Sequence, residues 1–85
     1  MTTTTVPAST LCKRVAATVA AHLSGRTVEI GDVFAGIHQT YAIESPRRVR
    51  VSYQMAAAVI REMKAHHGVT TVTDYAGTPT AVTFA

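Results

Sequence analysis

The sequence predicts a mainly α domain with a C-terminal β-hairpin, an α+β fold with three helices. Apolar residues recur at helical spacing in three separate segments of residues 9–67. The last segment, "VTTVTDYAGTPTAVTFA", is instead rich in Val, Thr, Tyr and Phe, with "AGTP" as its turn signal. A chain of 85 residues can bury one modest core. We therefore expect a single domain over residues 9–85, preceded by a disordered N-terminal tail at residues 1–8.

The first helix is predicted within "ASTLCKRVAATVAAHLSG". Its apolar residues follow a four-residue spacing that places them on one helical face: Leu11, Val15, Val19 and Leu23. Ser9 or Thr10 can serve as the N-cap, and Gly25 can end the helix. The Thr-rich residues before it have no periodic apolar partner, which is typical of a frayed end.

The second helix is predicted within "IGDVFAGIHQTYAI". Its amphipathic stripe contains five residues: Ile30, Val33, Phe34, Ile37 and Tyr41. Phe34 is expected at the centre of the core. Gly31 and Gly36 each weaken helix propensity by about 1 kcal/mol relative to Ala, so we expect another backbone to pass close to them.

The third helix has the clearest boundaries. Pro46 disfavours the α conformation at Ser45, so "ESPRRVRV" should be extended or a turn. Ser52 offers an N-cap and Gly68 a stop, which predicts a helix over residues 52–67. Its apolar stripe is formed by Met55, Ala56, Val59, Ile60 and Met63. The two methionines on this stripe are interpreted as core filler.

The hairpin completes the predicted order of three helices and two strands. Val82 and Phe84 alternate along the second strand and should face the core. The turn at residues 76–80 should form the tip.

Charge is unevenly distributed along the chain. The net charge is +3 with a pI near 9.5, and five of the eight basic residues lie between Glu44 and Gly68. This clustering predicts a basic face there. Cys12 is the lone cysteine, and no secretion signal or membrane-length apolar run is present. A cytoplasmic protein without membrane association is therefore expected.

The histidines, the missing catalytic motifs and the lone cysteine argue against a metal site, a cofactor and an enzyme. His66 and His67 are adjacent, so they diverge by about 100° on a helix, and they suit the helix dipole better than zinc. No Gly-rich phosphate loop, nucleophile elbow or close carboxylate pair occurs. Lys13 could lower the pKa of Cys12, but a half-buried, unreactive thiol is the favoured interpretation.

The element order resembles the winged helix-turn-helix family of DNA-binding domains. The closest local match is "SYQMAAAVIREMKAHHGVTTV", which is similar to the family's third, recognition helix and the Gly that leads into the wing. The resemblance covers about residues 9–85 and implies a small, stand-alone regulator of the phage type that binds double-stranded DNA. By this resemblance Ser52, Tyr53 and Gln54 would enter the major groove, and Arg61 would lie near the phosphate backbone. The turn at residues 76–80 would be the wing tip.

The chemistry of these side chains suits that surface. Gln54 can pair bidentately with adenine, Ser52 can bond to a base or a phosphate, and Tyr53 can stack on a sugar. The helix N-terminus itself attracts phosphate.

The basic segment before this helix would supply the remaining charge. Arg47, Arg48 and Arg50 can each contact a phosphate or reach into a narrow minor groove. In an extended segment Arg48 and Arg50 share one side, while Val49 and Val51 anchor the other side to the core. The alternative is a solvated basic loop with its valines turned inward.

Two function classes remain open from the sequence. A sequence-specific regulator of transcription is expected to act as a homodimer, because one helix buries too little surface on DNA for nanomolar specificity. A winged helix that binds a protein partner is the alternative. It is favoured by the absence of Arg and Lys from "DYAGTPT" and by Ala57 and Ala58 on the third helix.

Overall fold

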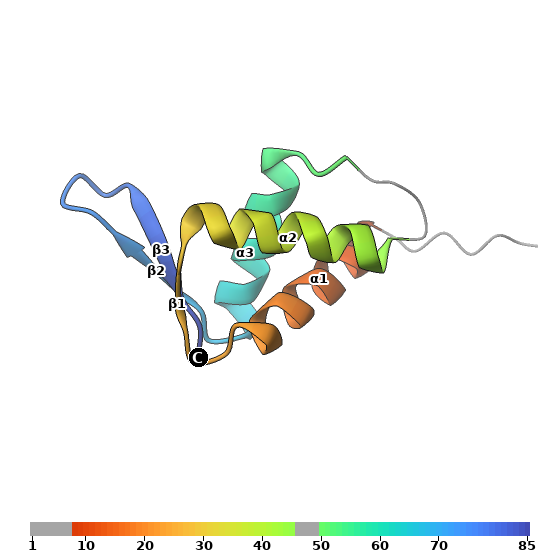
Figure 1. Ribbon diagram of the computed structural model, residues 1–85, viewed down its shortest axis with the longest axis horizontal. Coiled ribbons are helices and arrows are strands. Elements are labelled where there is room, and N and C mark those ends of the chain that lie inside the picture. Colours follow the sequence, from red (N-terminus) through yellow and green to blue (C-terminus); the bar gives the residue numbers. More distant parts are fainter. Residues whose placement is uncertain (1–7, 46–49) are drawn as a thin grey trace, which may run out of the picture.

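A computed structural model, which describes residues 8–45 and 50–85, confirms the α+β class. Its elements run in the order α1 (Ala8–His22), β1 (Thr27–Glu29), α2 (Ile30–Glu44), α3 (Tyr53–His66), β2 (Thr70–Thr73) and β3 (Pro79–Thr83). The helices pack together as one body, and the β2–β3 hairpin extends beyond them (Figure 1). Three helices followed by a C-terminal antiparallel hairpin give a winged-helix-like topology.

The sheet has three strands in the order β1-β3-β2, and both pairings are antiparallel. The sequence did not predict β1, because "TVE" is too short to show strand alternation. Its partner is also distant along the chain: Thr27 lies opposite Thr83, and their hydroxyls are 3.0 Å apart. This pairing attaches the hairpin to the segment between α1 and α2.

The core lies where the three helices meet the inner face of the sheet. Its largest fully buried side chains are Phe84, Ile37, Met63, Val15, Val33, Val59 and Val82. Val82 and Phe84 therefore face the core as predicted. The prediction that Phe34 occupies the core centre was wrong, since Phe34 is only half-buried. It follows Val33 by one residue and so points about 100° away from the buried stripe.

The helix boundaries differ from prediction mainly at α1. This helix begins at Ala8, so Ser9 and Thr10 lie inside it and do not cap it. Residue 8, which was predicted to be part of the disordered tail, is the first residue of the helix. Residues 1–7 lie outside the described residues. Gly25 follows α1 with a φ of 77°, a conformation that glycine adopts without strain.

The glycines of α2 do not mark a close helix crossing. A Cβ atom placed on Gly31 or Gly36 would have no neighbouring atom within 4 Å. The predicted close approach of another backbone was therefore wrong, and both positions have room for a side chain.

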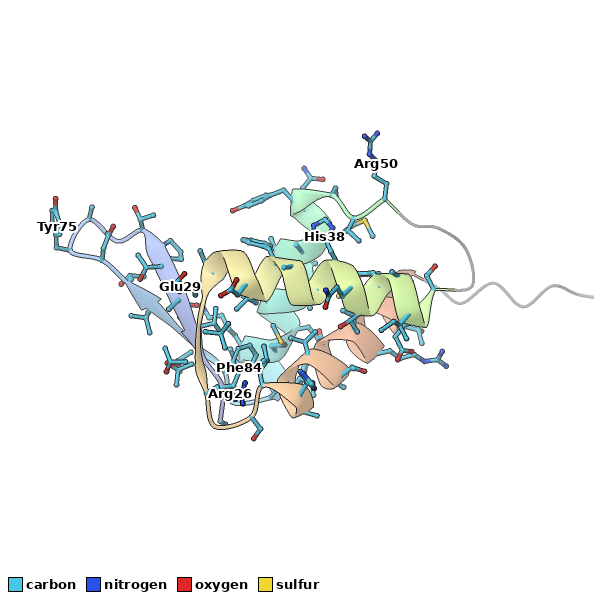
Figure 2. The ribbon with its side chains drawn as sticks, viewed as in Figure 1. Arg26, Glu29, His38, Arg50, Tyr75 and Phe84 are labelled. Carbon is cyan, nitrogen blue, oxygen red and sulfur yellow. The ribbon has the colours of Figure 1, made fainter. Side chains whose placement is uncertain are left out.

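The end of the chain is attached to the turn that follows α1. The backbone N–H of Phe84 donates to the carbonyl of Arg26 at 2.8 Å, and the N–H of Gly25 donates to the carbonyls of Phe84 and Ala85 at 3.1 and 3.0 Å. The hydroxyl of Ser24 donates to the Ala85 carbonyl at 2.6 Å. These bonds hold Phe84 in place beneath the helices, close to Arg26 in the view of Figure 2.

Candidate nucleic-acid interface

The N-terminus of α3 presents the three residues that the sequence singled out. Ser52 is the N-cap, and its hydroxyl oxygen accepts a hydrogen bond from the backbone N–H of Met55 at 3.2 Å. The side chains of Ser52, Tyr53 and Gln54 are all exposed. The capped end therefore directs three polar side chains and its free backbone N–H groups toward solvent.

The aromatic ring of Phe34 packs against one side of the Tyr53 ring. The two ring centroids are 5.7 Å apart, with an interplanar angle of 37°. Tyr53 is nevertheless 77% exposed. Phe34, although not the core centre, thus supports one side of an outward-facing aromatic ring.

The solvent-facing side of α3 combines two functional side chains with alanines. Gln54 and Arg61 are seven residues apart, so they share one stripe of the helix, and both are exposed. Ala58 and Ala65 occupy the same stripe. Ala58 is half-buried and Ala65 is exposed, so small side chains lie between and beside Gln54 and Arg61 on this stripe.

The cations around α3 are available for contact. Arg50, Arg61 and Lys64 are exposed, and among the described residues none of the three forms an ion pair. The Glu62 carboxylate lies instead beside His66, with Nε2 3.7 Å from Oε1. A phosphate could therefore bind these cations without displacing a protein carboxylate.

The predicted arginine segment is described only at its end. Arg47, Arg48 and Val49 lie outside the described residues, so their predicted contacts stay predictions. Arg50 projects away from the body just before α3 (Figure 2). Val51 is half-buried and packs against the core, as an anchor for this segment should.

Cys12 is not activated. Burial raises the pKa of its thiol above the ordinary value of 9.0, and the charge of Glu62 raises it further. A hydrogen bond with Tyr41 and the charges of Arg61 and Lys13 act in the opposite direction without reversing the shift. Lys13 does lower the pKa of this thiol, as the sequence suggested, but burial outweighs its effect and leaves the pKa raised.

The hairpin tip is an ordered turn. One carboxylate oxygen of Asp74 accepts hydrogen bonds from the backbone N–H groups of Ala76 at 2.9 Å and Thr78 at 3.0 Å. Gly77 has a φ of 82°, and its N–H donates to the Asp74 carbonyl at 3.0 Å. These bonds hold Tyr75 fully in solvent, with a relative exposure of 105%. Tyr75 was not among the residues that the sequence predicted for the site, and its full exposure depends on the geometry of this turn.

These features share one side of the molecule in the view of Figure 2. Arg50 and Tyr75 project toward the same side, near opposite ends of the domain, and the N-terminal end of α3 lies between them. The candidate interface therefore combines a capped helix end, a neighbouring arginine and an aromatic hairpin tip.

A separate groove of roughly 460 Å³ lies between α1 and α2. It is lined partly by Val19, Leu23, Val28 and the 81% exposed Ile43, and by none of the predicted DNA-contacting residues that the structure describes. Within residues 8–45 and 50–85, no group of His, Cys, Asp and Glu could hold a metal ion. None of the described helices has the length and apolar character that a membrane span needs.

No family model, curated protein or solved structure matches the chain. Its function is therefore inferred from its own residues and their geometry.

Proposed function

We propose that this chain binds double-stranded DNA as a small transcriptional regulator, with α3 in the major groove. The observation that carries the proposal is the exposed side of α3, where a capped N-terminus, Gln54 and Arg61 lie along one stripe. Gln54 would read adenine, and Arg61 would bind a phosphate. Arg47, Arg48 and Arg50 would position the helix on the backbone.

The first test is a fluorescence-anisotropy titration against random-sequence duplex DNA at two or more salt concentrations. Replacing Arg47, Arg48 and Arg50 with Ala should reduce the salt slope, log K against log [salt], by about 0.9 for each phosphate that the variant no longer neutralises. The matched control is Arg14→Ala with Arg26→Ala, which removes two exposed arginines from α1 and the turn after it. This control should leave the slope nearly unchanged.

Two results would contradict the proposal. If the folded protein does not bind DNA at low salt, the DNA-binding function is wrong. If the triple variant and the control change the slope equally, the arginine segment is not part of the interface.

A second candidate function is docking on a protein partner. It is favoured by the hairpin, where residues 68–85 carry no Lys or Arg and the turn exposes Tyr75 completely. Tyrosine side chains are common among the residues that contribute most to protein interfaces. A pull-down that recovers one stoichiometric partner after nuclease treatment would support this function, and Tyr75→Ala should then abolish the recovery.

A further inference from the structure

The outer edge of β2 is unpaired within the described chain. The strand order β1-β3-β2 places β3 in the centre and leaves β2 with one free edge. The hairpin extends past the helices, so they do not cover this strand (Figure 1). An edge strand presents backbone N–H and C=O groups that another strand can satisfy.

The residues of this edge are uncharged and suited to strand pairing. β2 has the sequence "TTVT", which is entirely β-branched. Thr70 lies opposite Thr83 and Val72 opposite Ala81, so Thr70 and Val72 share the outer face of the sheet. Val72 is 40% exposed there.

Common devices that prevent edge pairing are missing from most of this strand. Edge strands are often protected by lysine, proline or a bulge. β2 contains neither residue, and its one irregularity lies between Val72 and Thr73, at its end. The segment from Thr70 to Val72 remains regular and open.

Charge indicates which partner this edge favours. All eight Lys and Arg residues precede Gly68, so the hairpin is the part of the chain without fixed positive charge. Two copies of a chain with a net charge of +3 repel each other. They approach with the least repulsion through their hairpins, which makes a second copy a fitting occupant.

We propose that β2 pairs antiparallel with β2 of a second copy, about a two-fold axis through the middle of the strand. The two three-stranded sheets would then form one continuous sheet. With the axis at Thr71, Thr70 of each copy faces Val72 of the other on the outer face. The DNA-binding proposal calls for a dimer, but this contact is argued from the sheet and tested without DNA, so either proposal can fail alone.

The test is sedimentation velocity of the DNA-free protein over a concentration series, compared with the 9.0 kDa chain mass. The wild type should shift from one to two chain masses as concentration rises. Val72→Lys and, separately, Thr70→Lys should weaken dimerisation by about tenfold or more, because the two-fold axis places each new charge at the contact twice. Both sites are exposed, and circular dichroism should show an unchanged fold.

Ile43→Lys is the matched control. It introduces the same charge at an 81% exposed apolar residue on α2, at the groove between α1 and α2. This variant should dimerise like the wild type. A wild type that stays monomeric at millimolar concentration would overturn the proposal, as would a dimer disrupted by Ile43→Lys but not by Val72→Lys.

Hydrogen exchange adds a readout specific to the strand. Amide protection within residues 70–73 should increase with protein concentration in the wild type and not in Val72→Lys. A dimer without added protection in these residues would also overturn the proposal.

Discussion

Replacing Phe84 with Ala should destabilise this domain far more than the same change at Phe34. Phe84 is 2% exposed and lies between the helices and the sheet, whereas Phe34 is half-buried against Tyr53. Truncating a buried Phe costs about 3–5 kcal/mol. The partly exposed ring should cost about 1–2 kcal/mol, from incomplete burial and one aromatic contact.

These costs are large for a domain of this size. For 85 residues the expected free energy of unfolding is about 4–13 kcal/mol. Phe84→Ala therefore removes at least about a fifth of the total, and should lower the Tm by at least about 12 °C.

The assay is urea unfolding followed by far-ultraviolet circular dichroism, with the midpoint and the m-value fitted for each variant. Phe34→Ala serves as the comparison, because it removes the same atoms from the same kind of side chain. If Phe34→Ala costs as much as Phe84→Ala at equal m-values, the argument that Phe84 contributes more to the core than Phe34 is refuted.

Three further outcomes are expected. Ser52→Ala should cost about 1 kcal/mol in urea unfolding, because it removes the N-cap of α3; no loss would contradict the cap. Gly77→Ala should lower the free energy of unfolding by about 1–2 kcal/mol, because residue 77 has a positive φ. Gly36→Ala should raise it by up to about 1 kcal/mol, because alanine favours the helix and has room there. Two changes of the same sign would contradict this reasoning. Because the pKa of Cys12 is raised, iodoacetamide should alkylate it more slowly than free cysteine, and Glu62→Gln should speed the reaction. Because the pKa of Cys12 is higher in the folded protein than the ordinary 9.0, the folded state favours the neutral thiol. The free energy of unfolding should therefore be unaffected by this thiol below pH 9.0 and should fall as alkali ionises it.

Local signals in the sequence predicted the helices well. Ser52 and Gly68 act on neighbouring backbone groups, so their effect can be read without knowing the tertiary structure. β1 could not be predicted in this way, because its pairing with β3 depends on residues at the opposite end of the chain. Periodicity placed Phe34 and Phe84 on apolar segments but did not rank their burial, which depends on how the helices and sheet meet.

The candidate site was predicted in part for similar reasons. The exposure of Ser52, Tyr53 and Gln54 follows from their position at a helix start, which the cap made recognisable. The support of Tyr53 by Phe34 needed the packing of α2 on α3, and the full exposure of Tyr75 needed the turn geometry. Neither can be derived from composition or spacing.

The β1–β3 pairing also determines the order of events while the chain is being synthesised. Residues 8–66 can form all three helices before β3 has left the ribosome. β1 cannot pair until then, because its partner residues begin at Ala81. In a chain that has not yet reached Ala81, the surface that Val82 and Phe84 cover in the folded domain is open to water. Truncation before Ala81 would leave that surface permanently exposed, so quality-control proteases should remove such fragments quickly.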